Sequence, residues 1–288
     1  IVYGNMDIYI TQLNRELTGP KEGGLHRRVL TDRGNDVQLG YEGAHFYKIN
    51  GTYYLFFIHW PRGGHRVQAC FRADDLRGEF TGGDILDDTM GYADAGVAQG
   101  GIVDTPDGQW YAMLFQDHGA VGRIPVLVPM RWRDGFPVLG TNGKVPPRLE
   151  TESTRPGYPY APLVADDDFR YAPDVNGHAK LKNVWQWNHT PDAACWALEA
   201  SPPALRLTAS KRCANVTQAK NTLTQRMCGP RCEACVTVDG KDMREGDIAG
   251  LCALEGDYGL IGLRREPGGY ALAVLTRVLE SDPWIQRA

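Results

Sequence analysis

The feature of the sequence that most restricts its fold is a pattern that occurs twice. Residues 41–57 and 98–115 each begin with small residues, continue as an apolar strand, reverse at a turn and return as a strand rich in aromatic side chains. The turns, Asn50-Gly51 and Asp107-Gly108, lie 57 positions apart. Asn-Gly and Asp-Gly favour two-residue β-hairpin turns, because both turn positions there adopt positive φ. The repeat predicts two equivalent antiparallel hairpins in an all-β fold.

A second pattern recurs beside these hairpins. Residues 7–13, 67–73 and 126–132 each alternate apolar and polar positions and are followed by a turn. Four-stranded units that repeat at roughly 40–60 residues are typical of β-propeller blades. The chain then holds an outer half-blade, a fuller blade near 41–83 and another near 98–140, too few to close a propeller. The alternative is an ordinary antiparallel sandwich with two similar hairpins.

The character of the chain changes after residue 145. Prolines interrupt any regular strand ladder in the following segment, and short alternating strands return further on. The later strands are predicted at 205–209, 233–238, 259–263 and 270–275. We therefore predict three parts: a partial β-propeller over 1–145, a proline-rich linker over 146–180, and a truncated, concanavalin-like β-sandwich over 181–288.

Bulk properties restrict the classes of partner. The net charge of −4, without a long basic run, argues against nucleic acid. No apolar stretch is long enough for a membrane helix. The acidic run Asp166–Asp168 is expected to be a solvated loop. Since the chain begins with Ile1 rather than Met, we expect a processed or partial sequence. Nothing in it assigns a cellular location.

Six of the seven cysteines lie in the last third of the chain. Cys228, Cys232 and Cys235, with Cys213 or Cys252, could form a zinc-ligand set. Structural zinc usually takes two closely spaced ligand pairs, and only one tight pair is present. We therefore expect buried free thiols and no metal site.

Three segments carry a resemblance to a known family. Residues 41–56, 99–105 and 113–123 resemble the acid-bearing blades of glycoside hydrolase family 43. The β-sandwich domain appended in many members resembles two later segments, 185–192 with Trp196, and 221–226. The resemblance implies a five-bladed propeller that hydrolyses terminal xylosyl or arabinosyl linkages of plant polysaccharides with inversion. It implies an oligosaccharide or polysaccharide partner and no required cofactor, and it allows a structural calcium in the parent protein.

The resemblance places the family's general acid at Glu42, which we expect at the start of an inner strand facing the propeller axis. Inverting glycosidases pair such an acid with a base carboxylate about 6.5–9.5 Å away, which leaves room for a water molecule. The family's base Asp and a second Asp that tunes the acid match nothing before Glu42. The sequence Ala172–Val175 resembles the second one superficially, but it lies in the linker. The chain by itself is therefore expected to have negligible hydrolase activity.

Four further residues are predicted to contact the substrate. The hairpin repeat aligns Gln99 with Glu42, where many family members have a histidine that binds a central water or calcium. Arg123 matches a sugar-contacting arginine of the family, a role that suits the donors of a guanidinium. His118 should line the same opening, and Trp60 is a candidate for stacking on a sugar face. The structural alternatives are a channel hydrogen bond for Gln99, an ion pair for Arg123 and core packing for Trp60.

Two other interpretations stay open at this point. His45, alone on an apolar strand, is expected to be a satisfied core residue. The alternative function for the chain is a non-catalytic carbohydrate-binding remnant that has kept the scaffold but lacks the base.

Overall fold

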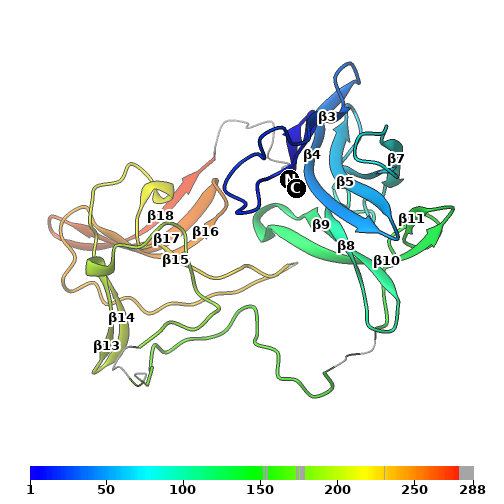
Figure 1. Ribbon diagram of the computed structural model, residues 1–288. Coiled ribbons are helices and arrows are strands. Elements are labelled where there is room, and N and C mark those ends of the chain that lie inside the picture. The colour runs from blue at the N-terminus through cyan, green and yellow to red at the C-terminus, as the bar shows by residue number, and fades with distance from the viewer. Residues whose placement is uncertain (152, 154, 173–174, 176–178, 230, 279–288) are drawn as a thin grey trace. The chain divides into compact units, whose positions relative to one another are not determined.

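The computed structural model describes residues 1–151, 153, 155–172, 175, 179–229 and 231–278 (Figure 1). The chain forms two compact units, one over 1–118 and 122–153 and the other over 119–121 and from 154 onward. Helical structure in the described residues is limited to three short 3₁₀ turns: η1 (Gly119–Val121), η2 (Ala193–Cys195) and η3 (Val216–Gln218). None of these has the length and apolar character needed to cross a membrane. The all-β prediction is confirmed.

The first unit consists of three antiparallel sheets. A three-stranded sheet contains, in order, β1 (Val2–Asn5), β2 (Asp7–Thr11) and β3 (His26–Thr31). The next sheet contains β4 (Val37–Ile49), β5 (Thr52–Pro61), β6 (Val67–Ala73) and β7 (Thr81–Leu86). The last contains β8 (Ala98–Asp104), β9 (Trp110–Asp117), β10 (Arg123–Arg133) and β11 (Phe136–Leu139). Both four-stranded sheets follow the order of the chain, as propeller blades do (Figure 1).

The predicted repeats occupy equivalent places in these sheets. β4–β5 and β8–β9 are the two predicted hairpins, and β6 and β10 are the third strands of their blades. If β1, β2 and β3 are the second, third and fourth strands of another blade, β2 is also a third strand. This arrangement confirms the partial propeller and excludes the simple sandwich for the first unit.

The two hairpin turns differ in geometry. Asn50 and Gly51 have φ of 49° and 91°, as a two-residue turn requires. The second connection is longer, because β8 ends at Asp104 and β9 begins at Trp110. There Gly108 N donates to Thr105 O, and the two-residue turn predicted at Asp107-Gly108 is wrong. Pro106 fixes a negative φ at the second position of this turn, which excludes the primed geometry.

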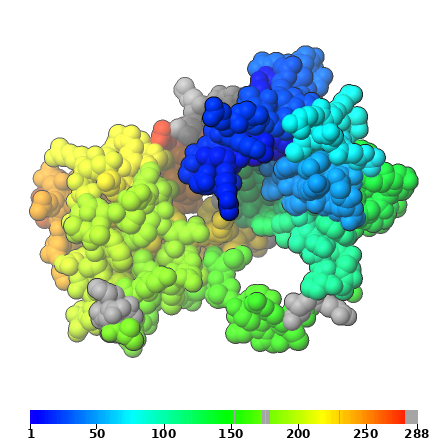
Figure 2. Space-filling view, in the orientation of Figure 1, coloured from blue at the N-terminus to red at the C-terminus, as the bar shows by residue number. Residues whose placement is uncertain are grey.

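Strand β5 lies between two hydrophobic clusters. Leu55 and Phe57 pack into one cluster with Ile8 of the N-terminal sheet, whereas Tyr54 and Phe56 pack into the other with strands of the second blade. Figure 2 shows the dark blue N-terminal segment lying directly against the lighter blue strands that follow it. Full burial of each large apolar side chain contributes roughly 1.5–3 kcal/mol. The apolar run of β5 therefore reflects burial on both faces.

The second unit contains shorter antiparallel pairings. β12 (Gln186–Trp187) pairs with β15 (Leu223–Thr224), and β13 (Trp196–Ala200) pairs with β14 (Pro203–Leu207). A three-stranded sheet is formed by β16 (Ile248–Leu254), β17 (Tyr258–Glu266) and β18 (Gly269–Arg277).

One predicted strand of the second unit is absent. Residues 233–238 form no strand, although strands do form near the other three positions predicted there. Val236 is exposed in this segment, and no described strand pairs with it. Alternation alone does not make a strand when no neighbouring edge supplies hydrogen bonds.

The prediction that Asp166–Asp168 form a solvated loop is wrong for the central residue, Asp167. The Asp167 side chain is 1% exposed and lies 3.4 Å from Lys182 Nζ. It accepts hydrogen bonds from Trp185 Nε1 at 2.7 Å, from the Tyr171 hydroxyl and from a backbone amide. Burial alone would raise the pKa of Asp167, but these hydrogen bonds and the Lys182 charge lower it on balance.

Replacing Asp167 with Asn should lower the free energy of unfolding at neutral pH by about 1.5–3 kcal/mol, because a charged acceptor is lost. The pKa of Asp167 is lower in the folded state, so its contribution is complete above the unfolded-state pKa and disappears as the pH falls through the folded-state pKa. Urea unfolding at about pH 7 and about pH 3 measures both effects. Asp168→Asn, at the exposed neighbour, is the matched control. Equal losses for the two variants at neutral pH would contradict this account.

Candidate active site

Glu42 lies in an irregular part of β4. The register of β4 on β5 shifts between Leu39 and Glu42, and again between Glu42 and His45. Bulges of this kind redirect a side chain from the regular alternation. β4 begins at Val37, so the prediction that Glu42 starts the strand is wrong. Asn5 Nδ2 donates a hydrogen bond to Glu42 Oε2 at 2.7 Å, a contact that the sequence did not suggest.

Gln99 packs against the backbone immediately after Glu42. Gly43 has a φ of +64°, and a Cβ built on it would lie 2.3 Å from Gln99 Nε2. A side chain at this position would therefore displace Gln99. The missing Cβ lets the first strands of two neighbouring blades meet here, with Gln99 packed against the residue that follows Glu42.

Gln68 binds the backbone of Gln99, and the sequence analysis missed this residue. The Gln68 side chain is fully buried, and its Oε1 accepts a hydrogen bond from Gln99 N at 2.7 Å. Its Nε2 donates to Gly100 O at 3.4 Å. Gln99 has a φ of +57°, which is unfavourable for a residue with a side chain. The signal for Gln68 was its polar character in the apolar strand Val67–Ala73, since a buried amide needs partners.

Strands β4 and β8 also approach each other closely at Gly101. A Cβ on Gly101 would lie 2.1 Å from the Tyr47 hydroxyl and 2.8 Å from His45 Nδ1. The Tyr47 hydroxyl accepts a hydrogen bond from Ile102 N at 2.9 Å. Burial lowers the pKa of His45, so this imidazole is neutral at neutral pH. The half-buried His45 thus packs against the Gly101 backbone.

Arg123 belongs to a network of charged and aromatic groups. Its Nε lies 3.3 Å from Asp117 Oδ1, and Arg66 contacts the other carboxylate oxygen of Asp117. The Arg123 guanidinium lies over the Phe115 ring at 4.6 Å, and that of Arg66 lies over the Trp60 ring at 4.8 Å. The Arg123 side chain is nevertheless 62% exposed, which leaves guanidinium donors accessible to a ligand.

Trp60, considered above as a residue that could stack on a sugar face, is buried in the structure. Only 7% of the residue is exposed, and Nε1 donates to Gly64 O at 2.7 Å. With the Arg66 guanidinium over its ring, Trp60 presents little surface to a sugar. This geometry favours the core-packing alternative.

His118 is fixed by two neighbours. Its ring stacks on Tyr92 with 4.0 Å between centroids, and Nε2 lies 2.9 Å from Gln116 Oε1. The buried Gln116 donates through Nε2 to two backbone carbonyls at 2.6 and 2.7 Å. Since its Oε1 can only accept, the proton of His118 is placed on Nε2.

A buried polar chain packs against the residue that precedes Glu42. Asp32 is fully buried, and its Oδ2 lies 3.6 Å from His59 Nδ1; neither atom has a hydrogen-bond partner among the described residues. His59 Nε2 lies 2.7 Å from Asp84 Oδ1. The Tyr41 ring packs on His59 at 4.8 Å. Burial, followed by the Asp32 and Asp84 charges, raises the pKa of Tyr41 to about 12, so Tyr41 is a neutral phenol.

The described part of the chain contains no group of three or more His, Cys, Asp or Glu side chains arranged to hold a metal ion. All seven cysteines are free, and only Cys70 is fully buried. The expected burial is wrong for four exposed thiols, Cys213, Cys228, Cys232 and Cys235. Their segments lack covering strands. Pro173 and Asp174, in the linker sequence set aside above, lie outside the described residues.

Comparison with known proteins agrees with this fold. Residues 2–137 match Glycosyl hydrolases family 43, and residues 176–283 match the Beta xylosidase C-terminal Concanavalin A-like domain. The chain belongs to glycoside hydrolase family 43.

Individual relatives extend well beyond this chain. A Beta-xylosidase of Formosa agariphila is 28% identical over 273 residues, covering 80% of this chain and 45% of the relative. A Putative beta-xylosidase of Xylanibacter ruminicola is 31% identical over 224 residues, covering 74% and 40%. The solved structure of a bifunctional GH43-CE protein of Bacteroides eggerthii has a TM-score of 0.79 at 41% identity, covering 96% of this chain and 34% of that one. The chain thus spans less than half the length of these relatives.

Replacing Gly43 with Ala should destabilise the first unit by roughly 1–3 kcal/mol, because it adds backbone strain and a clash with Gln99. Thermal unfolding measures the loss. Gly51→Ala is the control, because Gly51 also has a positive φ but its Cβ would meet no atom within 4 Å. The double variant Gly43→Ala/Gln99→Ala should recover the part of the loss that comes from the clash. Identical losses for Gly43→Ala and Gly51→Ala would show that the Gln99 contact contributes nothing.

Proposed function

We propose that the protein containing this chain is an inverting glycoside hydrolase that removes terminal xylosyl or arabinosyl units, with Glu42 as its general acid. The observation that carries the proposal is the position of Glu42 in a bulge of β4, where Gly43 and Gln99 bring two inner strands together. Family membership and the names of the xylosidase relatives support the reaction class and the sugar.

Glu42 acts by donating a proton to the glycosidic oxygen as the bond to the anomeric carbon breaks. Asn5 Nδ2 donates to Oε2, which leaves Oε1 to carry the acidic proton. Water attacks the opposite face of the sugar, and a second carboxylate takes the proton of that water. The family's base Asp matches no residue before Glu42 in this sequence, so no residue is assigned that role here.

Three side chains are proposed to orient the sugar. Arg123 is held by Asp117 yet exposed, so its free donors can bind sugar hydroxyls. His118, whose Nε2 proton is donated to Gln116, offers Nδ1 as an acceptor, and Gln99, which packs against Gly43, supplies a further polar contact. Trp60 is assigned a packing role because it is buried. The neutral phenol of Tyr41 and the neutral imidazole of His45 add no charge near the acid.

The proposal is tested with the protein encoded by the whole gene, assayed on xylobiose and on an arabinose-substituted xylo-oligosaccharide. Proton NMR of the first product should show the anomer opposite to that of the substrate linkage. Glu42→Gln should lower kcat/KM by about 10²–10⁴-fold, the usual contribution of general acid catalysis. Glu22→Gln, at an exposed glutamate, should leave it unchanged. Retained configuration, or saccharide binding without any turnover, would reject the proposal, and binding alone would favour the carbohydrate-binding alternative.

A further inference from the structure

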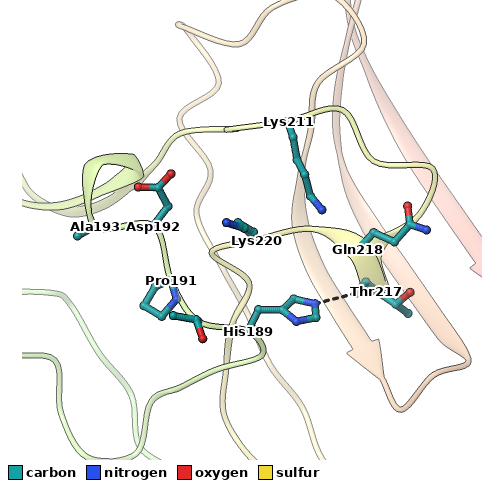
Figure 3. Close-up of a pocket in the computed structure, with 9 residues that line it drawn as sticks. His189, Pro191, Asp192, Ala193, Lys211, Thr217, Gln218 and Lys220 are labelled. Atoms are coloured by element: carbon teal, nitrogen blue, oxygen red, sulfur yellow. Dashed lines mark hydrogen bonds between the residues drawn. The ribbon is translucent and has the colours of Figure 1, made fainter.

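We propose that the second unit contains a binding site for a carboxylate-bearing saccharide, separate from the residues around Glu42. The site is a pocket of about 710 Å³ lined by residues 189–193, Lys211, Thr217, Gln218 and Lys220 (Figure 3). Its volume lies within the range of about 300–1,000 Å³ typical of ligand pockets. All lining residues belong to the second unit. The saccharide part of this inference rests on the proposed function.

The charge of the pocket favours an anion. Lys211 and Lys220 come from separate segments that both line the pocket, and Figure 3 shows the Lys211 side chain extending into it. Neither lysine forms an ion pair within the described part of the chain, so a bound anion would supply their counter-charge. The lining carboxylate of Asp192 accepts a hydrogen bond from Ala194 N through Oδ1 at 3.1 Å, and two lysines against this one carboxylate leave the pocket with an excess of positive charge.

The other lining groups favour a hydroxylated ligand. The Thr190 hydroxyl and the Gln218 amide nitrogen can pair with sugar hydroxyls, whereas the Thr217 hydroxyl is engaged by Asn215 and Arg277, and Gln218 Oε1 accepts from Ala214 N at 3.2 Å. The described lining contains no Trp, Tyr or Phe on which a neutral sugar ring could stack. Recognition must therefore rest on hydrogen bonds and charge, and a sugar acid supplies both.

The loops around the pocket are tied together before any ligand binds. Asn221 is 5% exposed and links to Asp192 twice, accepting from its backbone N at 2.8 Å and donating to its backbone O at 3.2 Å. Asn188 N donates to Thr222 O at 2.9 Å, and His189 Nε2 donates to Thr217 O at 2.8 Å. A rim held in this way loses little conformational freedom on binding.

Isothermal titration of the full chain with a glucuronic-acid-substituted xylo-oligosaccharide tests this site. The matched ligand is the same oligosaccharide with its carboxylate reduced to an alcohol, and inorganic phosphate is the non-sugar anion. We expect the acid to bind about 10-fold more tightly than its reduced form, and Lys211→Gln/Lys220→Gln to remove most of that difference, since each exposed ion pair contributes up to about fivefold. Lys241→Gln, at an exposed lysine of the same unit, is the control.

Equal affinities for the acidic and reduced oligosaccharides would overturn the inference. So would an unchanged preference in the double variant, or phosphate binding as tight as that of the acid, which would leave a general anion site. A thermal unfolding midpoint equal to that of the unmodified chain checks that the double variant is folded. Hydrolysis by the whole protein with no preference for the acid would reject this site alone. Preference for the acid without hydrolysis would reject only the proposed function.

Discussion

The close approach of Gln99 to the backbone of Gly43 is the contact on which the candidate active site depends. It requires three features at once: no side chain at Gly43, a left-handed backbone at Gln99, and a buried amide at Gln68 that binds the strained peptide. Together they join the first strands of two blades at the residue next to Glu42.

Strand β5 fixes the position of β4, which carries Glu42 and Gly43. Its alternating side chains fill two different hydrophobic clusters, so its position is fixed on both faces. It pairs with β4 through the bulged region that contains Glu42, and it carries His59, which packs against Tyr41. The geometry of the site therefore follows from the packing of the blades, whereas exposed groups such as Arg123 come from a strand end.

The sequence predicted those features of the fold that depend on local periodicity. The repeat identified β4–β5 and β8–β9 as equivalent hairpins and aligned Gln99 with Glu42. The prediction failed where a single residue decides the geometry: Pro106 excludes the two-residue turn that was predicted at Asp107-Gly108. It also failed where long-range partners decide the outcome. The burial of Asp167 depends on Trp185 and Lys182, and the bulges around Glu42 depend on the pairing with β5. Gln68 was missed because periodicity gives no information about hydrogen bonds between strands.

The most direct test of the central claim, that Glu42 is the proton donor, is the leaving-group dependence of the Glu42→Gln variant in the whole protein. A proton donor matters most when the departing alcohol is weakly acidic. The account predicts that the variant loses about 10²–10⁴-fold in kcat/KM on xylobiose but keeps most of its activity on 2,4-dinitrophenyl xyloside, whose leaving group needs no proton. An equal loss on both substrates would contradict the assignment, because Glu42 would then act through positioning or binding instead of proton donation.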